Sequence, residues 1–125
     1  MKRNTFLALG AINGFLSVTF GAFGAHALKA RIDASMLAAF HTGVEYHAVH
    51  ALALLATGLL LKHHESPWLR RAGWLFLLGI LLFSGSLYLL AVSGARGFGM
   101  VTPLGGLAFL GGWAALTIAA VKHGR

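Results

Sequence analysis

Residues able to do chemistry are few in this chain, and most of them are histidines. The sequence contains seven histidines, three acidic residues and no cysteine, so disulfides, thiolate metal sites and cysteine nucleophiles are excluded. Glu45 lies among the histidines: His41 precedes it by one helical turn, and His47 and His50 follow it. A carboxyl group beside imidazoles can share or transfer a proton near neutral pH, because histidine titrates in that range.

Metal or haem ligation would require histidines that converge on one point. His26 and His50 are the candidate ligands, but they belong to different segments, and no HxxxH-type pair supports them. An interhelical hydrogen bond is the simpler role for each ring. The chain also lacks an evident nucleophile and a second carboxylate beside Glu45. We therefore expect no metal ion and no cofactor, and we favour a non-enzymatic role over an enzymatic one.

The composition is that of a membrane protein. Hydrophobic residues make up 58% of the chain and charged residues 10%, whereas soluble domains contain about 45–50% apolar and about 25% charged residues. The net charge of +7 does not indicate a nucleic-acid partner, because the lysines and arginines form short clusters between long apolar runs. The expected partner is the lipid bilayer.

Four apolar segments predict an all-α fold, an integral membrane four-helix bundle that forms one domain over residues 1–125. A helix needs about 20 residues to cross a hydrocarbon core of roughly 30 Å. The predicted spans cover residues 5–28, 44–61, 72–92 and 103–121.

The second span is the least apolar of the four. Only eleven residues, 51–61, follow one another without a strongly polar side chain. The helix must therefore take His50, His47 and Glu45 into the membrane to cross it. Asp33 is a suitable N-cap for an earlier start. Residues 34–43 then form either an amphipathic extension of the same helix, which we favour, or a separate interfacial helix.

Basic residues predict the orientation of the bundle. With four spans, both termini and the loop between the second and third spans lie on one side of the membrane. That side holds seven lysines and arginines, and the opposite side holds three. Because lysine and arginine are enriched in cytoplasmic loops, both termini are predicted to lie on the cytoplasmic side.

The unusual polar residues of the spans share the outer half of the bilayer. At about 1.5 Å per helical residue, His50 lies roughly 18 Å and Glu45 roughly 25 Å from Lys62, in the outer half of the bilayer. A carboxyl group at this depth needs a partner. We therefore predict one connected polar cluster, a candidate binding site, in which Glu45 accepts a hydrogen bond from another helix. Its candidate members are His26, Glu45, Tyr46, His50, Ser84, Ser86, Tyr88 and Thr102.

Small residues recur along the first and fourth spans at spacings of three and four. Membrane helices associate through close packing of small residues, because lipid tails are as apolar as leucine. We expect both sets at helix–helix contacts, so that leucine at Gly14 or Gly112 would disrupt the bundle. The sets are Gly10, Gly14, Ser17, Gly21 and Gly24, and Gly105, Ala108, Gly112, Ala115 and Ala119.

Several short motifs also occur in order along the chain. They are Gly21-Ala22-Phe23-Gly24-Ala25-His26, Thr42-Gly43-Val44-Glu45-Tyr46, Phe83-Ser84-Gly85-Ser86-Leu87-Tyr88, Thr102-Pro103-Leu104-Gly105-Gly106 and Gly112-Trp113. With these motifs the chain resembles, over nearly its whole length, the YgdD-like family (domain of unknown function 423) of small inner-membrane proteins. The resemblance implies a multi-pass protein of the cell inner (plasma) membrane, and it implies no activity. The family pattern has glutamine where this chain has His47, which makes His50 the better ligand candidate.

Three functions remain open. The first is a structural or interaction module that forms a homo-oligomer or joins other membrane protein subunits, and the packing residues and the lack of a catalytic constellation favour it. The second is a binding or transport module with a polar pocket in the outer half of the bilayer. The third is a membrane subunit with a histidine-liganded metal or haem.

Overall fold

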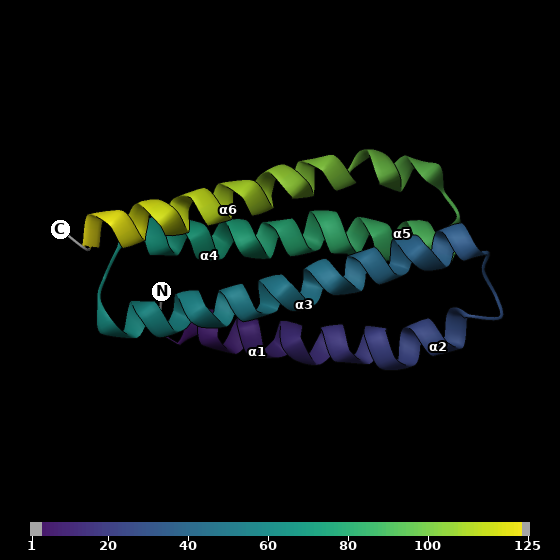
Figure 1. Cartoon of the computed structure of the whole chain (residues 1–125), viewed down its shortest axis with the longest axis horizontal. Coiled ribbons are helices and arrows are strands. Elements are labelled where there is room, and N and C mark those ends of the chain that lie inside the picture. Colours follow the sequence, from purple (N-terminus) through teal and green to yellow (C-terminus); the bar gives the residue numbers. More distant parts are fainter. Residues whose placement is uncertain (1–3, 124–125) are drawn as a thin grey trace.

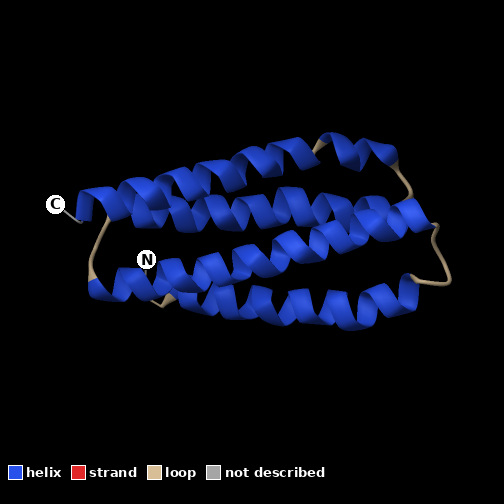
Figure 2. Cartoon of the chain, viewed as in Figure 1, coloured by secondary structure: helices blue, strands red, loops and turns tan. Residues whose placement is uncertain are grey.

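Four long helical rods form the structure, a computed structural model that describes residues 4–123 (Figure 1). The rods run up and down in chain order, so the first rod begins and the last rod ends on the same side of the molecule (Figures 1 and 2). The first rod comprises α1 (Thr5–Val18), η1 (Thr19–Gly24) and α2 (Ala25–Leu28); the second is α3 (Ala34–His63); the third comprises α4 (Pro67–Gly79), η2 (Ile80–Ser84) and α5 (Gly85–Ser93); the fourth comprises η3 (Arg96–Met100) and α6 (Thr102–His123).

Each rod is long and apolar enough to cross a membrane. The candidate spans contain 24, 30, 27 and 27 residues, whereas a crossing needs about 20. The predicted all-α fold is therefore confirmed, with four helices that are long and apolar enough to span a membrane. Helix α3 is continuous from Ala34 to His63, so residues 34–43 extend the second span and form no separate interfacial helix.

The cap of α3 explains its early start. The side chain of Asp33 accepts a hydrogen bond from the backbone N–H of Met36 at 2.8 Å, as expected for an N-cap. The hydroxyl of Ser35 donates a second bond to the same carboxylate oxygen at 2.8 Å. Because both bonds favour the charged carboxylate, they hold the pKa of Asp33 below its ordinary value.

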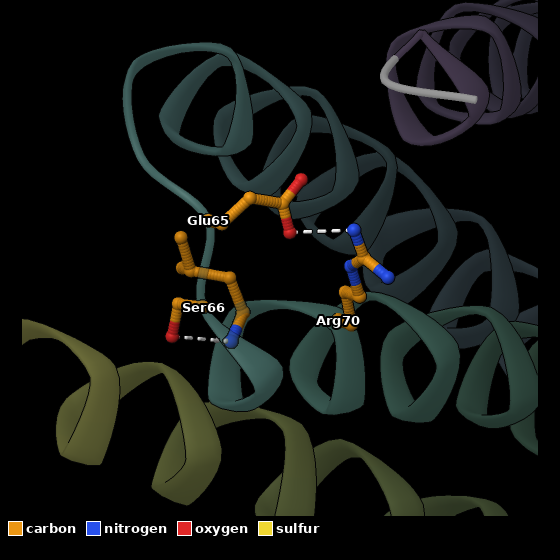
Figure 3. Close-up of polar contacts among 4 residues, drawn as sticks. Glu65, Ser66 and Arg70 are labelled. Carbon is orange, nitrogen blue, oxygen red and sulfur yellow. Dashed lines mark hydrogen bonds and ion pairs between the residues drawn. The ribbon is translucent and has the colours of Figure 1, made fainter. Parts of the chain in front are cut away.

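Helix α4 begins with a similar N-cap, which is Ser66 of the loop after α3. The hydroxyl of Ser66 accepts a hydrogen bond from the backbone N–H of Leu69 at 3.3 Å (Figure 3). Pro67 occupies the first turn, where its missing N–H costs nothing. Glu65 and Arg70 form an ion pair beside this cap. Both side chains are about half exposed, so water screens the charges and this pair contributes little to stability.

Two π-helical segments interrupt the rods, η1 in the first and η2 in the third. Such segments are rare and often occur at functional sites. Both contact α3 near Gly43: Ser84 of η2 donates a hydrogen bond to the carbonyl of Gly43 at 2.7 Å, and a Cβ added at Gly21 of η1 would lie 2.9 Å from Cγ1 of Val44. The two π segments therefore lie against the same part of α3.

Glycines allow α1 and α3 to approach until their backbones touch. A Cβ added at Gly10 would lie 2.7 Å from the backbone nitrogen of Leu55, and one added at Gly58 would lie 2.7 Å from that of Leu7. The pairs α1–α3 and α4–α6 make the most extensive contacts, and α3 joins them by packing on α4 and α5.

The small residues of α6 lie against the third rod. A Cβ added at Gly105 would collide with the backbone of Phe83. One added at Gly112 would lie 2.6 Å from Cδ1 of Phe76. The remaining members of this set are buried; they are Ala108, Ala115 and Ala119.

The small residues of the first rod differ from the expectation at one position. Gly10, Gly21 and Gly24 face α3, but a Cβ added at Gly14 would meet nothing within 4 Å. The buried positions of α1 include Gly10, Asn13 and Ser17, which are also spaced by three and four residues. Asn13 therefore takes the contact position, and the prediction that Gly14 lies at a contact within this chain is wrong.

Two apolar clusters hold the rods together. The largest fully buried side chains are Phe6, Leu54 and Phe76, and they bring α1, α3 and α4 into one core cluster. A smaller cluster joins Ala25, Phe40 and Ala91 between α2, α3 and α5. His50 stacks on Phe109 of the first cluster, and Tyr88 packs against the second.

We predict opposite effects of alanine at two glycines. Gly105→Ala should reduce the free energy of unfolding by about 1–3 kcal/mol, because the new methyl group would clash with the backbone of Phe83, which cannot move away as a flexible side chain could. Gly14→Ala, the matched control, should leave stability unchanged or raise it by up to about 1 kcal/mol, because alanine favours the helix. Thermal unfolding in detergent, followed by circular dichroism, measures both. Equal destabilisation by the two changes would contradict the helix contacts described here.

Candidate functional site

Helix α3 brings two histidines into the bundle. His47 and His50 lie on its inward face, and each is only 3% exposed. Lipid offers no hydrogen bonds, so a buried imidazole in a membrane bundle must find its partners within the protein. Both rings do so, and they use different helices.

His47 joins three rods through a chain of hydrogen bonds. Its Nε2 lies 2.9 Å from Oδ1 of Asn13 on α1, and its Nδ1 lies 2.9 Å from the hydroxyl of Tyr88 on α5. The amide nitrogen of Asn13 donates to the carbonyl of Leu9 at 2.8 Å, so the amide oxygen is the acceptor that faces His47. The ring therefore carries its proton on Nε2 and accepts from Tyr88 on Nδ1. We call Asn13, His47 and Tyr88 the His47 chain.

His50 makes a second, separate connection to α6. Its Nδ1 donates to the carbonyl of Tyr46 at 2.7 Å, and its Nε2 accepts from the indole N–H of Trp113 at 3.0 Å. The ring also stacks on Phe109, with 3.6 Å between centroids and 8° between planes. His50 is thus neutral with its proton on Nδ1, the opposite tautomer to that of His47.

The geometry leaves neither histidine free to bind a metal ion. Ligation requires a lone pair on a ring nitrogen, but the lone pair of His47 accepts from Tyr88 and that of His50 accepts from Trp113. Between residues 4 and 123, no three His, Asp or Glu side chains come together as a group able to hold a metal ion.

Ser84, Ser86 and Thr102 form hydrogen bonds between helices. Ser84 is fully buried and donates to the carbonyl of Gly43, which fastens η2 to α3. The hydroxyl of Ser86 lies 2.6 Å from that of Thr102, which joins α5 to the start of α6. These bonds connect helices, and they satisfy the hydroxyl groups without a ligand.

The prediction of one connected polar cluster built around Glu45 is wrong. Glu45 and His26 both lie on the surface of the bundle. In the part of the chain that the structure describes, neither side chain has a hydrogen-bond or ion-pair partner. Glu45 lies two residues from His47, which is about 200° around a helix, so the inward direction of His47 turns Glu45 outward.

Tyr46 lies at the edge of the bundle. It is 43% exposed, and its ring lies 4.6 Å from that of Phe83, measured between centroids. Together with His50, Phe109 and Trp113 it lines an open, largely apolar groove of about 740 Å³ between α3 and α6.

A smaller cavity of about 160 Å³ adjoins the His47 chain. It lies between the first and third rods, beside both π segments. Its polar lining comes from Asn13, His47 and Tyr88, whose hydrogen bonds to one another were described above. The cavity is well below the roughly 300–1,000 Å³ of a typical ligand pocket.

Sequence reasoning missed or undervalued three residues of the two networks. It passed over Asn13 and Trp113, and it ranked His47 below His50. Asn13 could have been found, because it is a strongly polar residue in the middle of the first span. It also lies three residues after Gly10 and four residues before Ser17, which is the spacing of a helix contact. The pairing of Trp113 with His50 has no local signal, since 63 residues separate them.

We predict that glutamine can replace His47, whereas leucine cannot. A glutamine amide can donate to Asn13 and accept from Tyr88, as the imidazole does, so His47→Gln should unfold close to the parent temperature. His47→Leu leaves both partners unsatisfied and should cost about 1–3 kcal/mol of stability. Thermal unfolding of both variants in detergent tests this, and a leucine variant as stable as the parent would contradict it.

Comparison with known proteins places these features in a family. A family model described as a protein of unknown function, DUF423, matches residues 20–106. The chain is 48% identical over 119 residues to the UPF0382 membrane protein YwdK of Bacillus subtilis, covering 94% of this chain and 97% of that protein. It is 41% identical over 125 residues to the UPF0382 inner membrane protein YgdD of Escherichia coli, covering 100% and 95%. No solved structure matches the chain.

These matches confirm the family resemblance drawn from the sequence motifs. They cover nearly the full length of this chain and of its relatives, and the four apolar helices agree with the relatives' description as membrane proteins. The chain therefore belongs to the DUF423 family and is a multi-pass protein of the cell inner membrane.

Proposed function

We propose that this protein is a structural or interaction module of the inner membrane, which self-associates or joins a larger membrane complex. The observation that supports it is a contrast between the inside and the outside of the bundle. Inside, the buried polar side chains of the His47 chain, His50 and Ser84 all have partners. Outside, Glu45 has none among residues 4–123.

The position of Glu45 inside the membrane is energetically unfavourable. It lies about 25 Å along α3 from Lys62, inside a hydrocarbon core of roughly 30 Å. An acidic side chain costs about 2.5–3.5 kcal/mol at the centre of a membrane helix, and less towards the edge. A partner chain with a polar group at this depth would remove the cost.

The alternative functions have less support. A transport pathway needs polar groups with free hydrogen-bonding capacity along a cavity, whereas the buried His47 and His50 are fully engaged. The groove beside His50 is almost entirely apolar. A metal or haem subunit would need free ring nitrogens, which the buried His47 and His50 lack.

The proposal includes the orientation of the bundle, with both termini in the cytoplasm. Lys62, Arg71 and Lys122 lie at one end of the rods, and two of them stand over the ring of Trp68: Arg71 at 4.4 Å and Lys122 at 5.5 Å from its centroid. An indole surrounded by basic side chains suits the cytoplasmic interface, where both residue types are enriched. The opposite end carries Lys29, Arg31 and Arg96.

We predict that the protein is multimeric in its native membrane. Extraction into nanodiscs directly from membranes, followed by native mass spectrometry, should show this chain with at least one further protein chain. The control is the same protein after exhaustive dilution with detergent, which should favour the single chain by mass action. A single chain under every condition, including direct extraction, would overturn the proposed function.

We also predict the side on which the termini lie. Fluorescent-protein fusions at the carboxyl terminus should be active, because that reporter matures in the cytoplasm, and alkaline phosphatase fusions at the same point should be inactive. Phosphatase fused in the loop after α5 provides the matched control and should be active. The reverse pattern would overturn the orientation.

A further inference from the structure

One face of α3 is free along the length of the helix, and it carries a regular pattern. Its residues repeat at alternating spacings of three and four, which is the pattern of a left-handed helix–helix contact. All are exposed, including Leu52 at 66% and Leu59 at 53%. We call this set the α3 stripe; it consists of Thr42, Glu45, Val49, Leu52, Ala56 and Leu59.

The stripe is opposite to the face that holds the bundle together. The inward face of α3 carries His47, His50 and Leu54, which pack against the other rods. Inside the described chain, the stripe has no helix packed over it. An apolar face alone could simply face lipid. Glu45 distinguishes this one, because a carboxyl group gains nothing from lipid.

We propose that a second copy of this chain packs against the α3 stripe, so that Glu45 of each copy faces Glu45 of the other. This inference rests on the proposed function and names its partner. Two copies with the same orientation in the membrane are related by a twofold axis along the membrane normal. Such an axis brings residues of equal depth together, and each half of the contact is then the same six residues.

The carboxyl group makes this contact self-complementary. When one Glu45 is protonated, its O–H can donate to the carboxylate of the other, and two carboxyls at one site commonly share a proton in this way. His41 lies one turn farther out on α3 and is also exposed and unbonded within residues 4–123. Its imidazole can donate to the same pair from either copy. An unrelated partner would have to supply a matching donor at the same depth.

The first experiment maps the contact by disulfide formation. The chain contains no cysteine, so one introduced cysteine reports on one position. Leu52→Cys lies in the stripe, and Leu110→Cys on α6 is the control. Leu110 is 67% exposed and Leu52 66%, and they lie at similar depths, about 18 Å from Lys122 and about 15 Å from Lys62. Oxidation in native membranes should link two copies through Leu52→Cys and leave Leu110→Cys unlinked.

The second experiment tests the role of the carboxyl group. Dimerisation is measured by energy transfer between labelled copies during dilution with lipid. Glu45→Gln should keep the parent dissociation constant, because an amide both donates and accepts. Glu45→Leu should raise it about tenfold, in line with the strength of hydrogen bonds between membrane helices. Glu65→Gln, in the loop, is the control and should change nothing. Helix content should be normal in all variants, because Glu45 takes no part in the fold.

The outcomes separate this inference from the proposed function. Linking of Leu110→Cys instead of Leu52→Cys, or a cross-link from Leu52→Cys to a different protein, overturns the α3 dimer but leaves an interaction module. An unchanged dissociation constant for Glu45→Leu overturns the role of the carboxyl pair. Single chains in direct membrane extracts, with no cross-link at either position, overturn both.

Discussion

Hydrogen bonding in a medium that offers none is the constraint on which this bundle depends. A polar side chain inside the membrane must be paired within the protein, and each such pair fixes the rotation of the helices that contribute to it. His47 sets α1, α3 and α5 relative to one another through Asn13 and Tyr88. His50 does the same for α3 and α6 through Trp113. Because both histidines lie on α3, this helix is the reference for the others.

Close packing of small residues makes these hydrogen bonds possible. The backbones of α1 and α3 touch at Gly10 and Gly58, and the backbone of η2 touches α6 at Gly105. Only at such distances can a short side chain such as Ser84 reach the carbonyl of another helix. The two π segments lie where these approaches occur, next to the His47 chain. Packing and hydrogen bonding thus support one another, since each holds the helices at the separation that the other requires.

The need to pair polar groups within the protein also determines which side chains lie on the outer surface. Once His47 and His50 face inward, Glu45 must face outward, because it precedes them by two and five residues, which is about 200° and about 140° around the helix. Within residues 4–123, the interior has satisfied polar groups and the exterior has an unsatisfied carboxyl group, which supports our proposal of a subunit over that of a pore. The proposals of an interaction module and of a second copy on α3 both follow from this asymmetry.

The sequence by itself determined the four spans, the cap at Asp33 and the small residues of α6, because hydropathy, capping and spacing are local properties. It also placed the polar residues in the same half of the bilayer, since the rise along a helix is constant. Only the tertiary structure decided which of them face one another. Asn13 and Gly14 both fit a spacing of three and four between Gly10 and Ser17, and the inward His47 and the outward Glu45 differ in depth by only about 3 Å. The rotation of each helix about its axis distinguishes these cases, and it is set by contacts with residues far away in the sequence, such as Tyr88 and Trp113.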